Sequence, residues 1–174
     1  PEPISERNIV ESTKIYDRTG TKVLYEIYGE EKRTVVPFDE IPEHLKQATL
    51  SIEDADFYNH SALDFRAILR AAVVNLRSGQ IVEGGSTITQ QLAKKAFLTD
   101  EQTPTRKAKE LVLAIRLEQR YSKDEILELY LNQIPYGSNA YGIAAAAQTF
   151  FNKNAKDLTM EESALLAALP NAPT

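Results

Sequence analysis

The sequence predicts a mainly α-helical domain preceded by a small β-hairpin. Three observations predict this class: strand-type residues are confined to the first 40 residues, helical apolar spacing dominates the remainder, and helix-start signals recur along it. The 174 residues, 43% hydrophobic and 26% charged, suffice for one domain with a core. We expect a lead-in over residues 1–40 and a helical domain over 41–174. Both are expected to be parts of a longer protein.

The lead-in is predicted to form a β-hairpin. Ile15–Tyr16 and Val23–Tyr28 are rich in β-branched and aromatic residues, and turn residues lie between them at Asp17–Gly20. Val35–Val36, just before a proline, predicts a further extended piece.

The helical domain is predicted from apolar spacing and caps. Pro42 suits the first position of a helix whose apolar residues continue to Ile52. Capping-box pairs at Thr87/Gln90, Ser122/Glu125 and Thr159/Glu162, and the Thr103-Pro104 pair, mark four helix starts. Two more helices are expected over residues 64–76 and 142–151. The helix after Pro104 is expected to bury a stripe made of Ala108, Leu111, Val112 and Ile115.

Composition excludes several kinds of site. A net charge of -5 argues against a general nucleic-acid binder. Without cysteine there are no disulfides, thiolate metal sites or cysteine nucleophiles. The two histidines, His44 and His60, are too few and too poorly spaced for a metal centre, and no Ser-x-x-Lys nucleophile occurs. No apolar run approaches the roughly 18 residues of a membrane span.

A first polar cluster opens at Glu53. The preceding helix places Glu53 near the end of an apolar stripe, where a carboxylate is costly to bury unless it has partners or a chemical role. From Glu53 to His60 the chain then offers three carboxylates, two aromatic rings and a histidine. Taken alone, the pattern fits either a functional site or a charged helix end followed by a polar loop.

A second cluster, Gly-Gly-Ser-Thr-Ile-Thr-Gln-Gln, occupies residues 84–91, and Lys94 follows one turn beyond Gln90. Paired glycines before a capped helix let backbone N–H groups approach a ligand, and a helix N-terminus favours anions. A flexible turn with an N-cap explains the glycines and Thr87 equally well, but not the adjacent glutamines and three hydroxyls.

Two further clusters have simpler explanations. Arg106 and Glu110 are four residues apart, as in an ordinary helical ion pair. Residues 123–137 read as a capped helix with a core stripe, in which Asn132 is the least explained residue.

Together the clusters resemble the signature motifs of the peptidoglycan glycosyltransferases, glycosyltransferase family 51, found in class A penicillin-binding proteins and monofunctional transglycosylases. A fifth match runs from Tyr141 to Lys153, so the resemblance covers roughly residues 40–170. The motifs are Glu53-Asp54-x-x-Phe57-x-x-His60, residues 84–91, Arg106-Lys107-x-x-Glu110 and Lys123-x-x-Ile126-Leu127-Glu128-x-Tyr130-Leu131-Asn132.

The resemblance implies a lysozyme-like α fold and an enzyme that polymerises lipid II into β-1,4 glycan strands, with inversion and release of undecaprenyl pyrophosphate. It implies Glu53 as general base and Glu110 as the second catalytic carboxylate. The substrate-binding residues that it implies are Asp54, Phe57, His60, Ser86, Thr87, Gln90, Gln91, Lys94, Arg106, Lys107 and Asn132. A divalent cation, Mg²⁺ or Mn²⁺, is compatible with the family, and the role of Glu110 stays open between orienting Arg106 and holding such a cation.

The implied partners are lipid II, the lipid-linked glycan strand, the outer face of the bacterial cytoplasmic membrane, a following transpeptidase domain and other cell-wall proteins. No nucleic acid is expected, and the resemblance makes the chain a target of moenomycin. A non-catalytic glycan- or partner-binding module of the cell-wall machinery is the alternative, and so is a lysozyme-like hydrolase. The presence of both Glu53 and Glu110 argues against the module, and the cationic residues argue against the hydrolase.

Four positions depart from the family pattern. Ala62 and Asn152 stand where glycine is usual, Gln102 where arginine is common, and Phe150 where tyrosine is common. The change at Gln102 puts one phosphate contact in doubt.

The helix over residues 64–76 is expected to face a membrane, because a lipid-tethered substrate requires a site near the bilayer. Its apolar residues Phe65, Ile68, Leu69 and Leu76, with Ile81 and Val82, would enter the interface, while Arg66, Arg70 and Arg77 meet anionic head groups. An ordinary core-facing amphipathic helix is the alternative.

Overall fold

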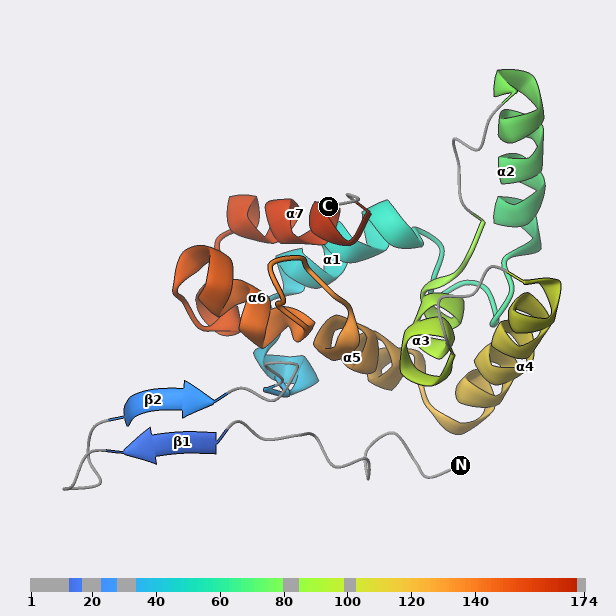
Figure 1. The fold of residues 1–174 in the computed structure, drawn as a ribbon. Helices are drawn as coiled ribbons and strands as arrows, with labels where there is room; N and C mark the ends of the chain where they lie inside the picture. The colour runs from blue at the N-terminus through green and yellow to red at the C-terminus, as the bar shows by residue number, and fades with distance from the viewer. Residues whose placement is uncertain (1–12, 17–22, 28–33, 80–84, 99–102, 172–174) are drawn as a thin grey trace. The chain divides into compact units, whose positions relative to one another are not determined.

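The computed structural model describes residues 13–16, 23–27, 34–79, 85–98 and 103–171, with the two strands described by their backbone alone (Figure 1). The chain divides into two compact units. The terminal unit combines Pro1–Leu45 with Leu131–Thr174, and the central unit is the continuous stretch Lys46–Tyr130.

The described chain is mainly helical, which confirms the predicted fold class. The boundaries between the units fall within α1 (Glu43–Glu53) and α5 (Lys123–Gln133). The central unit contains α2 (Phe65–Ser78), α3 (Ile88–Phe97) and α4 (Pro104–Arg120). The terminal unit contains α6 (Gly142–Phe151) and α7 (Met160–Ala168), with single 3-10 turns at Phe38–Glu40, Ala155–Asp157 and Leu169–Asn171.

The lead-in forms the expected two-stranded pairing. β1 (Thr13–Tyr16) and β2 (Val23–Ile27) are antiparallel, with Thr13 opposite Ile27. The predicted turn at residues 17–20 lies outside the described residues.

The predicted helix starts are confirmed, with one difference in detail. Full reciprocal boxes form at Ser122/Glu125 and Thr159/Glu162. At α3 the Thr87 hydroxyl accepts from the Gln90 backbone N–H at 3.2 Å, as expected. The Gln90 side chain, however, donates to the carbonyl of Ala62. It therefore ties α3 to a preceding loop instead of completing a capping box.

The stripe predicted for α4 is wrong. Val112 and Ile115 are 51% and 42% exposed, and Ala108 is also exposed. The buried face instead carries Glu110, Ala114 and Leu117. An apolar-pattern argument misses this face because one of its positions is a carboxylate, whose burial is made tolerable by ion pairs.

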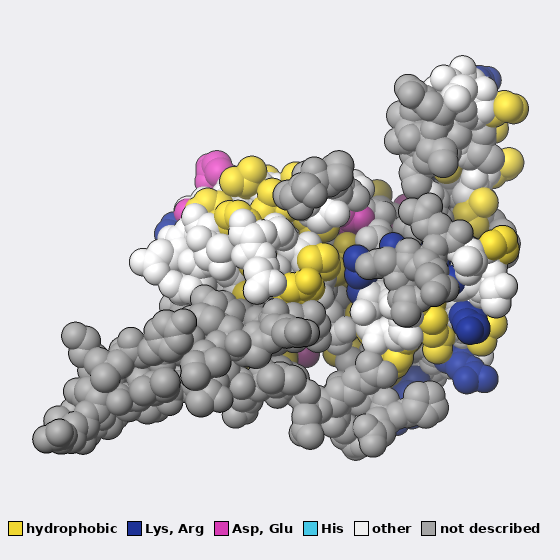
Figure 2. Space-filling model, in the orientation of Figure 1, with side chains coloured by type: hydrophobic (Ala, Val, Ile, Leu, Met, Phe, Trp, Pro, Cys, Tyr) yellow, Lys and Arg dark blue, Asp and Glu magenta, His cyan; other side chains and the backbone are white. Residues whose placement is uncertain are grey.

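The apolar face of α2 is also directed outward. Leu69 and Leu76 are 68% and 85% exposed, and Ile68 and Val73 are exposed as well. Figure 2 shows apolar side chains along the outer edge of this helix. The helix ends at Ser78, and Gly79 follows with φ +69°. These side chains therefore do not pack into a core formed by the described residues.

In the terminal unit the side chain of Asn132 substitutes for a β-strand partner. Its Nδ2 donates to the Val36 carbonyl at 2.9 Å, and its Oδ1 accepts from the Val36 N–H at 2.8 Å. Gly142 packs directly on the Asn132 backbone: a Cβ added there would lie 2.4 Å from the Asn132 carbonyl oxygen. Its φ of +78° independently favours glycine.

Candidate active site

Glu53, the last residue of α1, is held by one oxygen only. Its Oε2 accepts from Gln91 Nε2 at 2.8 Å. Its Oε1 is buried, and no donor among the described residues lies within hydrogen-bonding distance of it. Burial raises the pKa of the Glu53 carboxyl, the Gln91 bond lowers it, and the Asp54 charge raises it again, with a net upward shift. Such a carboxylate is a candidate proton acceptor.

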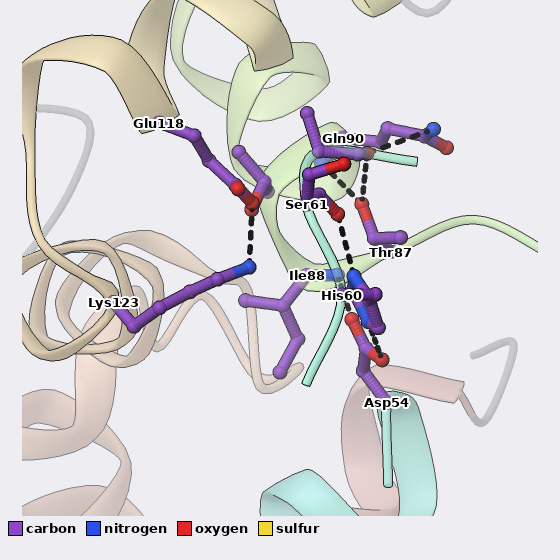
Figure 3. A network of polar contacts seen from close by, with 10 residues as sticks. Asp54, His60, Ser61, Thr87, Ile88, Gln90, Glu118 and Lys123 are labelled. Carbon is purple, nitrogen blue, oxygen red and sulfur yellow. Dashed lines mark hydrogen bonds and ion pairs between the residues drawn. The ribbon is translucent and has the colours of Figure 1, made fainter. Parts of the chain in front are cut away.

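Asp54 connects the loop after α1 to the start of α3 (Figure 3). Its Oδ1 lies 2.6 Å from His60 Nε2, and its Oδ2 accepts from the Ile88 backbone N–H at 3.0 Å. A carboxylate at a helix N-terminus is stabilised by the unpaired backbone N–H groups there.

His60 is held in a charge-favouring environment. Burial alone would lower the pKa of its imidazole, but bonds to Asp54 and to the Ser61 carbonyl, with the Asp54 charge, outweigh burial and raise it. Because Asp54 bonds both His60 and the Ile88 N–H, it connects His60 to the start of α3.

The carbonyl of Ala62 is a second anchor for α3. It accepts from Thr87 Oγ1 at 2.9 Å and from Gln90 Nε2 at 3.3 Å. Thr87 and Gln90 are almost completely buried. Their polar atoms thus position the segment that begins at Ser86, and their predicted substrate contacts stay predictions.

Glu110 is the centre of the cationic cluster. Its side chain is 3% exposed and forms ion pairs with both Arg106 and Lys107. Lys107 Nζ also donates to Ser86 Oγ at 2.9 Å and contacts Gln90 Oε1 at 3.4 Å. One buried carboxylate therefore holds two cations beside the start of α3, which is an arrangement suited to an anionic group.

A further network of side-chain hydrogen bonds was not predicted from the sequence. Glu118 Oε1 accepts from Thr89 Oγ1 at 2.6 Å and from Lys123 Nζ at 2.7 Å (Figure 3). Lys123 also lies 4.4 Å from the ring centre of the fully buried Phe57. No sequence pattern indicates it, because Thr89 and Glu118 are 29 residues apart.

The structure places nearly all predicted site residues in the central unit. The exception is Asn132, which lies in the terminal unit, with both of its side-chain polar atoms bonded to Val36. Its predicted contact with substrate stays a prediction. Lys94 is half-buried on α3.

One group of described side chains has the composition of a metal site. Asp54, His60 and Asp64 each offer a ligand atom, and these atoms lie within 4.8 Å of one another. Both Asp54 oxygens and both His60 nitrogens already have protein partners. The hydrogen-bond network explains these two residues without an ion, so they do not identify a cation site.

Comparisons with known proteins identify the family of this chain. The family model described as Transglycosylase matches residues 20–174. The chain is 53% identical to penicillin-binding protein 1A of Aquifex aeolicus and 48% identical to penicillin-binding protein 1F of Bacillus subtilis, over 94% of this chain and 22% of each relative. It is 51% identical to penicillin-binding protein 1A of Neisseria gonorrhoeae over 85% of this chain and 18% of that relative.

The chain thus spans about a fifth of the length of these curated relatives. The matched region contains both candidate carboxylates, the capped start of α3 and the cationic cluster of α4. With the match extending over most of the sequence, the chain belongs to the transglycosylase family, glycosyltransferase family 51.

Proposed function

We propose that this chain is the part of a peptidoglycan glycosyltransferase that polymerises lipid II into β-1,4 glycan strands and releases undecaprenyl pyrophosphate. The observation that carries the proposal is the state of Glu53, a half-buried carboxylate with a raised pKa, with one oxygen held by Gln91 and no donor to the other among the described residues.

A sugar hydroxyl is a weak nucleophile until a base removes its proton. In the proposed reaction the acceptor hydroxyl gives its proton to the Glu53 carboxylate as its oxygen attacks the anomeric carbon of the donor sugar. The bond from that carbon to the pyrophosphate breaks, and its electron pair leaves with the pyrophosphate. Attack opposite the α-linked leaving group gives a β-linkage, so the configuration inverts.

The leaving group needs charge stabilisation more than a proton. Arg106 and Lys107, held together by Glu110, supply two cations beside Ser86, and Lys94 lies on the neighbouring helix α3. Charge-assisted hydrogen bonds from such groups are shorter and stronger than neutral ones. In this proposal Glu110 acts by orienting Arg106 and Lys107.

The test is polymerisation of purified lipid II by this chain and by Glu53→Gln. The amide keeps the shape of the side chain but cannot accept the proton, so the rate should fall by about 10²–10⁴. Glu161→Gln, an exposed carboxylate of α7, is the matched control and should polymerise normally. Polymerisation by Glu53→Gln within a few-fold of wild type would remove Glu53 from this role. Hydrolysis of finished glycan without polymerisation would identify a lysozyme-like hydrolase.

We further propose that the chain works at the outer face of the bacterial cytoplasmic membrane, with α2 in contact with the lipid surface. Among the residues that the structure describes, no helix is long and apolar enough to cross a bilayer. α2 instead offers exposed Leu69 and Leu76 together with exposed Arg70 and Arg77. Apolar side chains flanked by arginines suit the interface of an anionic membrane.

Binding to vesicles of anionic phospholipid tests the membrane contact. Leu69→Ser with Leu76→Ser should lose vesicle binding while keeping its circular dichroism spectrum and melting temperature. The control is Val112→Ser with Ile115→Ser on the exposed face of α4. Equal loss in both double variants would show general apolar adhesion and contradict a defined contact at α2.

A further inference from the structure

We infer that Tyr130 is a positioning residue for Glu53 and acts through Gln91. This inference rests on the proposed role of Glu53 as general base. Tyr130 belongs to α5, Gln91 to α3 and Glu53 to α1, and all three lie in the central unit.

The three side chains form a directed chain of hydrogen bonds. The Tyr130 hydroxyl donates to Gln91 Oε1 at 3.2 Å, and Gln91 Nε2 donates to Glu53 Oε2 at 2.8 Å. Tyr130 is fully buried, so its ring is fixed by packing and its hydroxyl has a defined place. Burial of the ring does not explain the hydroxyl, which is the group that reaches Gln91.

The hydroxyl determines which end of the Gln91 amide faces the base. An amide has an accepting oxygen and a donating nitrogen at nearly equal positions. A donor at Oε1 favours the orientation in which Nε2 points at Glu53. That orientation stabilises the carboxylate, whereas the reversed amide would present an oxygen and favour the protonated acid. Tyr130 thereby holds the pKa of Glu53 below the value that burial alone would produce.

The same chain distinguishes the two oxygens of the base. Oε2 accepts from Gln91, whereas Oε1 is buried and has no donor among the described residues. Losing the anchor at Tyr130 frees both the amide and the plane of the carboxylate. Base strength and base orientation therefore depend on a residue that does not touch Glu53.

The decisive variant is Tyr130→Phe, which keeps the ring and removes the hydroxyl. The acid limb of the polymerisation rate should move to higher pH by about half a unit to one unit, as expected when one hydrogen bond of typical strength is lost. Titration of the Glu53 carboxyl by NMR, in substrate-free chain labelled with ¹³C at glutamate, should show the same shift. Glu53→Gln identifies the signal.

A double-mutant cycle separates positioning from packing. Gln91→Met should shift the Glu53 titration upward, and adding Tyr130→Phe should shift it no further, because the path is already broken. Tyr58→Phe, which removes a hydroxyl bonded to Asp124 Oδ1 at 2.8 Å, is the matched control and should leave the titration unmoved.

Two results would overturn the inference. One is a Tyr130→Phe rate lowered equally at every pH with an unshifted Glu53 titration, which would indicate packing alone. The other is additive shifts from Tyr130→Phe and Gln91→Met. If Tyr130→Phe does not fold, site-specific Tyr130→3-fluorotyrosine, a stronger donor of nearly equal size, should move the titration to lower pH. A shifted titration in a chain that polymerises nothing would leave the inference standing and contradict the proposed function.

Discussion

Replacing Gly142 by alanine should destabilise the protein more than an ordinary glycine substitution. Two costs arise at this position. A residue with a Cβ at φ +78° loses roughly 1–2 kcal/mol to left-handed strain. The new Cβ would also lie 2.4 Å from the carbonyl oxygen and 2.9 Å from the carbonyl carbon of Asn132, both of them backbone atoms.

The clash cannot be relieved without breaking something else. The Gly142 N–H donates to the Ile134 carbonyl at 2.9 Å, so moving the helix start away from Asn132 strains that bond too. A hydrogen bond of this kind is worth about 0.5–1.5 kcal/mol. Strain, clash and the weakened bond together should cost about 3 kcal/mol or more.

Gly79 provides a matched control. Its φ of +69° carries the same backbone strain, but a Cβ added at this position would meet no atom within 4 Å. Gly79→Ala should therefore cost only about 1 kcal/mol. Urea unfolding followed by circular dichroism gives both free energies of unfolding. A Gly142→Ala loss no larger than that of Gly79→Ala would refute the close-packing argument.

Three further predictions concern the site and its surroundings. Asn152 ends α6 with φ +53°, so Asn152→Gly should change the melting temperature little, whereas Asn152→Ala should cost about 1 kcal/mol in urea unfolding. Burial raises the pKa of Glu53, so the charged form of this side chain destabilises the folded protein. Glu53→Gln should therefore raise the free energy of unfolding at pH 7.5, where Glu53 is charged, and this gain should disappear near pH 4. Urea unfolding at both pH values measures it. Lys94→Ala and Arg106→Ala should each weaken binding of a pyrophosphate-bearing lipid, measured by calorimetry, whereas exposed Lys109→Ala should matter much less; equal losses would indicate diffuse attraction.

The sequence predicted the helices best where local chemistry determines them. Thr103-Pro104, Ser122/Glu125 and Thr159/Glu162 fix helix starts through contacts three residues apart, which a pattern can reveal. The departure at Asn152 is explained by the structure, because asparagine is among the few residues that tolerate the left-handed conformation in which glycine is usual.

Features that depend on distant residues were not predictable in this way. The stripe assigned to α4 was wrong because the face that a helix buries depends on the elements packed against it, and the buried face of α4, which contacts α3, includes Glu110. At the site, the pattern indicated Glu53 and Gln91 separately. It could not show that they touch, or that Tyr130, which reads as core, completes the chain.

The pairing of Asn132 with Val36 has a consequence for how the chain is made. The two residues are 96 positions apart, and His44 binds the Leu158 carbonyl across 114 positions. A ribosome adds roughly 5–20 residues per second, so the Val36 backbone waits on the order of 5–20 s before its partner exists. The stretch Lys46–Tyr130, which forms one compact unit, is synthesised entirely within that interval. Synthesis thus favours an order in which the central unit folds first. The segments before and after it in the sequence, which pair through Val36 and Asn132, come together last.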